Sequence, residues 1–402
     1  MEQLQSIDLS DDAPNVGGRL IVGDVGYPTV QEAYDDASDG DTVYIHSSYD
    51  AQAAGENFPI VIDQNEKEVA LVGGHPSGSE INASHTSGEN VVEVYGRGSA
   101  DYRNTPLIKN LKLVGGDVGL QVVSSPNATF AHLILFNNRS HGVHLTTTSS
   151  DSTGTFGTRW FDCEAWSNGG DGFRAEQEAS PHGTTFIRCN ATWNGWNNHG
   201  SGVHLAGYSS VFWGGTAQRN SRYGVNLIRG GSQVCRDTYF ESNGLEASIP
   251  VQLRTTNTFG SVIDGCYFLG RMLGASSNMS NVQGHDRAAR AVHLHGSRGC
   301  TVRSCTHRHH RDGFISVMGS GSWDNDLHES SHYQIGSEDP FLYQDTADRT
   351  RSNGIIIEQD LRDVEGQFVG DRGIHDGSGR SSWGLCMWNG STWVSIVDGN
   401  TV

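Results

Sequence analysis

Six polar residues recur at matching positions along the chain, and their side chains suit hydrogen bonding to a sugar chain. Each follows an apolar residue within a short alternating segment, so the apolar residue is expected to face inward and the polar one outward. The six residues are His144, Arg174, His204, Asn226, Gln252 and His293. Stacked at a pitch of about 4.8 Å, they would form an outward row. We predict that this row binds a glycan or receptor. The alternatives are an ordinary polar sheet face and a contact between subunits.

A second group of residues combines carboxylates with an arginine. Asp162, Glu164 and Arg188 fall on adjacent segments, beside small residues that are expected inside. Paired carboxylates serve as acid, base or nucleophile in glycoside hydrolysis. These three residues are therefore the catalytic candidates, although a salt bridge between neighbouring segments is the interpretation we favour.

The densest group of histidines lies at positions 307–310. Alternation places His307 and His309 on one face, and imidazole is a common metal ligand. The spacing matches no known zinc motif, and a turn or a subunit contact explains these residues equally well. We assign no metal and keep His307 and His309 as the candidates for one.

A repeat must position all of these residues. An Asn, a short polar turn and an apolar–polar–apolar stretch return along the chain, as at 138–145 and 168–175. The apolar anchors are mostly about 22 to 30 residues apart, which is typical of a solenoid. They are Leu120, Val143, Phe173, Val203, Val225, Val251, Val292, Phe314 and Ile355. We predict an all-β fold, a right-handed parallel β-helix.

The residues before the repeat predict a covered start of the solenoid. Residues 29–37 suggest a short capping helix with Thr29 as N-cap and Glu32 at the capping-box position. Strands are expected over 39–45, 59–62 and 69–72. The predicted parts are an acidic N-terminal arm (1–15), a cap with the first coils (16–104), the parallel β-helix (105–360) and a small C-terminal β module (361–402).

The segment 27–74 contains this helix, the strand Gly-Asp-Thr-Val-Tyr-Ile at 40–45 and Val-Gly-Gly at 72–74. It resembles the start of the pectin-lyase-like β-helix superfamily, which includes polysaccharide lyases, glycoside hydrolases and viral tailspikes. The resemblance implies a fold and leaves the activity open. In the lyases, carboxylates hold calcium and an Arg abstracts the sugar proton. No such signature is present here, so no catalytic residue is transferred, no cofactor is predicted, and calcium is expected only for a lyase.

The C-terminal residues differ from the repeat. Gly-Asp-Arg at 370–372, followed by Asp-Gly and by Leu-x-x-Trp-Asn-Gly-Ser-x-Trp at 385–393, resembles the small β modules that end many virion spike and fibre proteins. Asn389-Gly390 predicts a hairpin. Trp383, Trp388 and Trp393 are too apolar for a free tail, so we predict that they take part in oligomerisation.

Charge and cysteine content limit the setting. The net charge is −19 and Lys occurs only at 67, 109 and 112, which favours a halophilic, haloarchaeal source and argues against nucleic-acid binding. An ordinary acidic extracellular protein is the alternative. No run of residues is apolar enough for a membrane helix, and the N-terminus lacks the features of a signal peptide.

The seven cysteines contain no Cys-x-x-Cys pair; we predict buried thiols, with disulfides or metal as the alternative.

These observations predict a virion structural appendage, which means a spike, fibre or capsid-surface projection of a halophilic virus. It would form a homotrimer on the virion surface, contact other virion proteins through residues 1–15, and attach to a host-surface glycan or surface-layer glycoprotein. The alternatives are a secreted polysaccharide lyase or glycoside hydrolase and a cellular surface protein. Whether the chain is an enzyme stays open.

Overall fold

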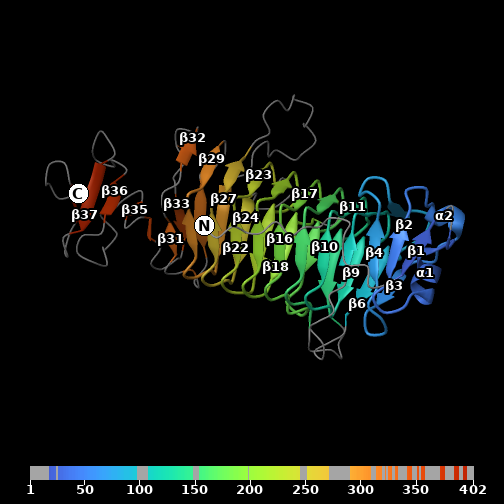
Figure 1. The fold of residues 1–402 in the computed structure, drawn as a ribbon. Coiled ribbons are helices and arrows are strands. Elements are labelled where there is room, and N and C mark those ends of the chain that lie inside the picture. Colours follow the sequence, from blue (N-terminus) through green and yellow to red (C-terminus); the bar gives the residue numbers. More distant parts are fainter. Residues whose placement is uncertain are drawn as a thin grey trace, which may run out of the picture.

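The computed structural model describes residues 18–23, 26–96, 107–147, 154–197, 199–244, 251–270, 290–308, 314–318, 322 and 325–327, and the backbone of short strands between 331 and 395. Over these residues the chain winds into stacked coils, which run from the blue to the orange end of Figure 1. A complete coil gives one strand to each of three long sheets, here called A, B and C. The predicted all-β, right-handed parallel β-helix is confirmed.

Sheet A forms one side of the β-helix, and its strands pair in parallel from β1 to β34. Large aromatic side chains fill its inner face: Phe130, Trp160, Phe186 and Phe212 occupy one inward column. The strands are β1 (Arg19–Val22), β2 (Thr42–Ile45), β4 (Ala70–Gly73), β7 (Leu107–Lys109), β10 (Thr129–Ala131), β13 (Arg159–Phe161), β16 (Thr185–Ile187), β19 (Val211–Trp213), β22 (Val234–Arg236), β25 (Val262–Asp264), β28 (Thr301–Arg303), β31 (Asp326–Leu327) and β34 (Arg351–Ser352).

Sheet B carries the predicted binding row. Its strands are β3 (Ile60–Asp63), β6 (Val92–Tyr95), β9 (Leu120–Val123), β12 (Val143–Thr146), β15 (Phe173–Ala175), β18 (Val203–Ala206), β21 (Val225–Ile228), β24 (Val251–Thr256), β27 (Arg290–His295), β30 (Ile315–Met318) and β33 (Leu342–Asp345). Sheet C completes each coil with β5 (Glu80–Asn82), β8 (Lys112–Val114), β11 (Ile134–Phe136), β14 (Glu164–Trp166), β17 (Asn190–Thr192), β20 (Thr216–Gln218), β23 (Tyr239–Glu241), β26 (Tyr267–Leu269), β29 (Thr306–Arg308) and β32 (Ser331–Tyr333).

The recurring Asn forms a ladder inside the turn from sheet C to sheet B. The side-chain amide of Asn168 donates to Asn194 Oδ1 at 2.9 Å, and Asn194 donates to Asn220 Oδ1 at 3.0 Å. The amide of Asn194 also donates to the carbonyl oxygen of Ala165 at 2.9 Å. These amides satisfy buried backbone groups of each turn, which would otherwise destabilise the stack. The repeat is therefore fixed by an internal hydrogen-bond ladder as well as by apolar anchors.

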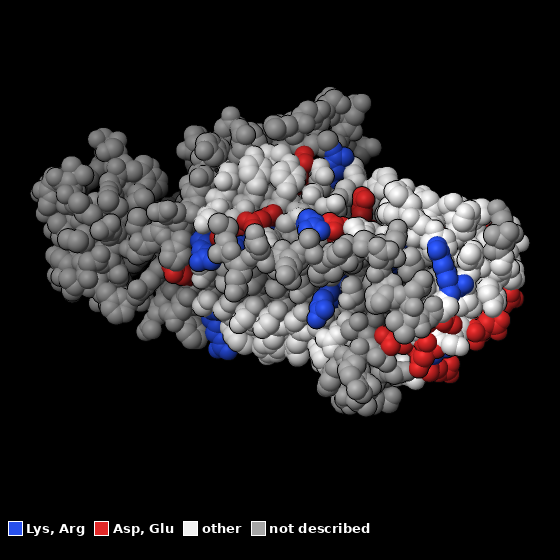
Figure 2. Space-filling view, viewed as in Figure 1, with Lys and Arg blue, Asp and Glu red and all other residues white. Residues whose placement is uncertain are grey.

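The N-terminal cap forms as predicted. Helix α1 (Val30–Asp36) begins after Thr29, whose side chain accepts a hydrogen bond from the Glu32 backbone amide at 3.1 Å. Strands β2, β3 and β4 cover most of the three expected segments. A second short helix, α2 (Ala51–Ala54), was not predicted. Figure 2 shows acidic side chains gathered at this end of the molecule, over the region of α1 and β3.

Three predicted anchors need correction. Leu253, and not Val251, pairs with Val225, and the next partner of Val292 is Ile315 rather than Phe314. Ile355 lies in β35 (Ile355–Ile357) of sheet A, outside sheet B. In each case several apolar residues stand close together, so spacing alone selects the wrong one.

Beyond β35 the described backbone is a small β-meander. Strands β36 (Arg372–His375), β37 (Gly384–Trp388) and β38 (Trp393–Ser395) pair antiparallel in turn, and Trp388 is opposite Trp393. The hairpin predicted from Asn389-Gly390 is confirmed. Trp383 lies outside the described residues, as do the side chains of Trp388 and Trp393, so their role in oligomerisation stays a prediction.

The described cysteines are free and buried, as expected for thiols packed inside the coils. They are Cys163, Cys189, Cys235, Cys266, Cys300 and Cys305. Among the described residues, no helix combines the length and apolar character needed to cross a membrane.

Candidate functional site

The outer face of sheet B brings five of the six predicted binding residues into one column. His144 pairs with Arg174, Arg174 with His204, and His204 with Asn226. His293 occupies the same column further along. The column is less exposed than expected, because Asn226 and His293 are buried and the others are half-buried.

Gln252 does not belong to this column, and Arg254 takes its place between Asn226 and His293. Strand β24 starts two residues before the position that aligns with the start of β21, so Gln252 precedes the part of β24 that pairs with β21. Its side chain is buried and continues the Asn ladder: Gln252 Oε1 accepts from the Asn243 side chain at 2.7 Å. The prediction for Gln252 was wrong because counting from Val251 shifts the register by two residues.

Around the first members of the column lies a group of ionisable side chains, here called the sheet B cluster. It consists of His141, His144, Asp171, Arg174 and Glu176. Arg174 Nη1 donates to Asp171 Oδ2 and Arg174 Nε donates to Glu176 Oε1, both at 2.8 Å. His144 Nε2 lies 3.5 Å from Glu176 Oε1. His141 Nδ1 accepts a hydrogen bond from the Asp171 backbone amide at 2.9 Å.

Burial sets the protonation of the cluster's imidazoles. It lowers the pKa of His141 to about 4, and it also lowers the pKa of His144 and of His204 in the same column. Burial by itself would raise the pKa of Asp171, but the neighbouring imidazoles and Arg174 lower it. Since these imidazoles are neutral near pH 7, Arg174 is the cation that holds the Asp171 carboxylate in its ionised form.

The cluster therefore offers both donors and acceptors at neutral pH. Two carboxylates share one guanidinium, so one negative charge is left uncompensated within the cluster. Further along sheet B the outer face becomes more cationic. Arg254 Nη1 donates to the hydroxyl of Tyr223 at 2.5 Å, and the guanidinium of Arg222 lies over the same ring. One end of the face suits sugar hydroxyls, and the other end adds cationic groups.

Three members of the cluster were missed by the sequence reasoning. His141 and Asp171 stand in the turns before β12 and β15, and Glu176 follows β15 directly. Alternation assigns faces only inside a strand, so it gave no direction for turn residues. Asp171 stands three residues before Arg174 and Glu176 two residues after it. This spacing allows one Arg to bind two carboxylates, and it is the feature of the sequence that could have identified them.

Two residues of the predicted catalytic group, Asp162 and Arg188, form an ion pair. Arg188 Nε and Nη2 donate to the two oxygens of Asp162 at 2.7 and 2.6 Å, and the Arg188 side chain is 62% exposed. Both residues stand in the short turn between sheets A and C, whereas Glu164 lies in β14 opposite Asn190. The favoured interpretation, a salt bridge across coils, is confirmed for Asp162 and Arg188.

The predicted metal candidate His307 lies in the core. It follows Phe240 and Phe268 in the inward column of sheet C and stacks on Phe314 with ring centroids 4.5 Å apart. His309 lies outside the described residues. Within the described part of the chain no three His, Cys, Asp or Glu side chains converge as metal ligands would.

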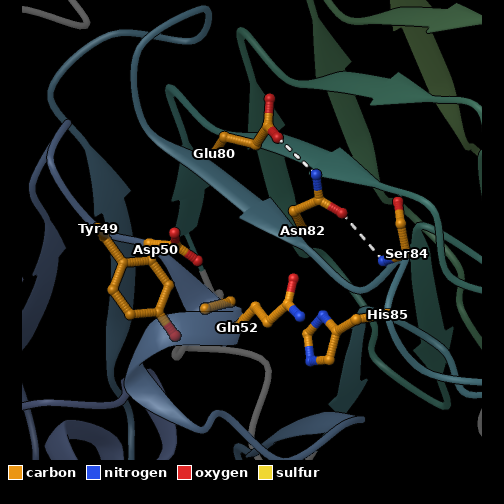
Figure 3. A pocket seen from close by; sticks show the side chains of 8 residues that line it. Tyr49, Asp50, Gln52, Glu80, Asn82, Ser84 and His85 are labelled. Carbon is orange, nitrogen blue, oxygen red and sulfur yellow. Dashed lines mark hydrogen bonds between the residues drawn. The ribbon is translucent and has the colours of Figure 1, made fainter.

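A polar hollow of about 380 Å³ lies beside the N-terminal cap (Figure 3). Its polar groups are largely engaged with one another: Asn82 donates to Glu80 at 2.8 Å and accepts from the Ser84 backbone amide at 2.9 Å. Asp50 caps helix α2. The hollow is lined by Tyr49, Asp50, Ala51, Gln52, Glu80, Asn82, Ser84 and His85. These bonds explain its polar lining by local structure, so the sheet B face is the stronger candidate.

No protein-family model matches the sequence, and no curated protein matches it either. Solved structures do share the fold. An alginate lyase from Paenibacillus sp. aligns with a TM-score of 0.51 at 12% identity, over 82% of this chain and 99% of that one. The catalytic domain of a GH87 α-1,3-glucanase aligns with a TM-score of 0.52 at 10% identity, over 79% of this chain and 59% of that one.

An N-terminal fragment of gene product 12 of bacteriophage Phi29 also aligns, with a TM-score of 0.50 at 11% identity, over 84% of this chain and 71% of that one. At these identities the likeness shows the fold alone. The same β-helix occurs in a lyase, a glucanase and a phage protein, so function has to be argued from the site.

Proposed function

We propose that this chain is a virion appendage protein that attaches to a glycan of the host surface, and that the outer face of sheet B binds the glycan. The observation that carries the proposal is the sheet B cluster, continued along the column by His204, Asn226 and Arg254. Its neutral imidazoles, carboxylates and guanidinium groups alternate between donor and acceptor at the pitch of the coils. An extended sugar chain presents hydroxyl groups at a comparable repeat.

The phage protein among the structural neighbours supports the virion part of the proposal, and the acidic, lysine-poor composition supports a high-salt setting. The N-terminal arm would then contact other virion proteins. We further propose a homotrimer closed by the C-terminal module. Deleting residues 366–402 should give monomers or aggregates in light scattering, and an unchanged trimer would contradict this role.

The test of the proposed function is a binding screen on the full chain in about 2–3 M salt, a condition that supports a halophilic protein. The probes are alginate, polygalacturonate, α-1,3-glucan and host-envelope polysaccharide, and the readout is binding by calorimetry. Replacing both His144 and His204 with Ala should weaken binding at least tenfold while the unfolding curve stays close to wild type. Arg188→Ala, on the exposed turn of the same coils, is the matched control. Equal affinity of the double variant and the control would overturn the proposal.

A polysaccharide lyase or hydrolase is the second candidate, and one observation favours it. Glu176 is 31% exposed and lies beside the neutral His144; burial would raise the pKa of Glu176, but its bond to Arg174 lowers it, so a sugar in the column could meet two groups that can accept a proton. The same screen should record reducing ends and the ultraviolet absorbance of unsaturated uronates. Release that disappears in Glu176→Gln and persists in Glu164→Gln would establish the enzyme. Binding without release would support attachment.

A further inference from the structure

A row of residues, exposed except for Gly231, follows the ends of the sheet B strands, in the turn that leads to sheet A. It contains one residue per coil: His182, Tyr208, Gly231, Phe259 and Arg298. Backbone hydrogen bonds fix the register, since Gly183 N donates to Tyr208 O, Ser209 N to Gly231 O, Ser232 N to Phe259 O and Gly260 N to Arg298 O, all at 2.8–2.9 Å. We call these residues the aromatic row.

The rings of the row are in continuous contact, each tilted by 57–58° against the next. The ring centroids of His182 and Tyr208 are 5.0 Å apart, those of Tyr208 and Phe259 are 5.7 Å apart, and the guanidinium of Arg298 lies 5.9 Å from the Phe259 centroid. Tyr208 and Phe259 are two coils apart. They meet because Gly231 lies between them: a Cβ at position 231 would come within 2.3 Å of the Phe259 ring.

These rings are open to solvent. Tyr208 is 48% exposed and Phe259 is 41% exposed, and they are two of the three large exposed hydrophobic side chains among the described residues. His182 and Arg298 are exposed as well. A lone exposed aromatic residue needs no explanation. A contiguous group of exposed rings with polar groups at both ends is the pattern of a binding surface.

We infer that the aromatic row is a second subsite for the same glycan, one that stacks on the C–H faces of pyranose rings. This inference rests on the proposed function. The rings supply apolar faces, while the imidazole, the Tyr208 hydroxyl and the Arg298 guanidinium can meet the hydroxyl rim of a sugar.

Continuity with the sheet B face supports a single ligand. His204 stands four residues before Tyr208, Arg254 five before Phe259, and His293 five before Arg298. Within each coil the chain thus passes from the outer column of sheet B to the row. A glycan that crosses the outer face of sheet B in the direction of the strands therefore reaches the aromatic row after the column. The row selects sugars with an uninterrupted C–H face, whereas the column selects hydroxyl and acidic groups.

The test replaces both Tyr208 and Phe259 with Ala and measures affinity for the polysaccharide that binds most tightly in the screen above. We expect about a tenfold loss or more, since the two stacking contacts together correspond to roughly 1.4 kcal/mol. Trp166→Ala is the matched control, because Trp166 is 43% exposed but lies on sheet C. Gly231→Ala is a milder variant that should weaken binding by displacing the Phe259 ring. Its unfolding midpoint should stay near wild type, because Phe259 can turn toward solvent.

The outcomes separate the two proposals. If the His144/His204 variant loses affinity while the Tyr208/Phe259 variant binds like Trp166→Ala, the aromatic row is not a glycan subsite and the proposed function stands. If the row variant loses affinity and the histidine variant does not, the binding site is the row and the sheet B proposal fails. If the wild-type chain binds none of the polysaccharides, both fail.

Discussion

Two groups in this β-helix combine Arg with carboxylates and lie within residues 162–188, yet they differ in their surroundings. In the turn between sheets A and C, Arg188 and Asp162 form a pair whose guanidinium is 62% exposed and whose carboxylate is 28% exposed. On sheet B, Arg174 binds Asp171 and Glu176, and the Asp171 side chain is only 5% exposed. The residue types are nearly the same, and burial separates the two groups.

The difference has electrostatic consequences. An exposed pair gains little, because water and salt screen the attraction. In the sheet B cluster the carboxylate of Asp171 depends on Arg174 for compensation, and the same burial keeps His141 neutral. Such dense, perturbed groups are typical of functional sites, which is why the cluster, and not the predicted Asp162 group, is the candidate site.

The largest expected effect comes from removing the arginine in each group. Arg174→Ala leaves a buried carboxylate and its neighbour Glu176 without their cation, so we expect the free energy of unfolding to fall by about 3–5 kcal/mol. Arg188→Ala should cost no more than about 0.5 kcal/mol. Urea unfolding of both variants measures the contrast. Similar losses in the two variants would mean that burial does not distinguish the groups.

Much of this contrast was accessible from sequence. The alternation after Val143, Phe173 and Val203 placed His144, Arg174 and His204 correctly, because a strand that is buried on one face fixes its register. The alternation placed Gln252 wrongly, because Val251 and Leu253 are two residues apart and either could be the inward anchor. It also missed Asp171 and Glu176, whose positions depend on how turns stack on neighbouring coils, which a strand pattern does not contain.

The second prediction concerns pH. The pKa of His141 falls from the ordinary 6.5 to about 4 in the folded chain. Between these values the unfolded chain binds the proton and the folded chain does not, so stability falls as pH falls from about 6.5 to 4. His141 alone accounts for about 3 kcal/mol of this loss. In urea unfolding across this range, His141→Gln should show a shallower decline than wild type. A His141→Gln profile parallel to wild type would contradict the burial argument.

The smallest expected effect tests the exposed pair directly. Asp162→Asn removes the charge that Arg188 binds and leaves a side chain of nearly the same shape, so at low salt the free energy of unfolding should fall by about 0.5 kcal/mol or less. In about 1 M salt the Debye length shrinks to about 3 Å, and the variant should match wild type. Asp171→Asn is the matched comparison on sheet B, because its loss should persist in salt that cannot enter the buried site. If the loss of unfolding free energy in Asp162→Asn also persisted in salt, the pair of Asp162 and Arg188 would be shielded from solvent as the sheet B cluster is. It would then return as a candidate for the functional site.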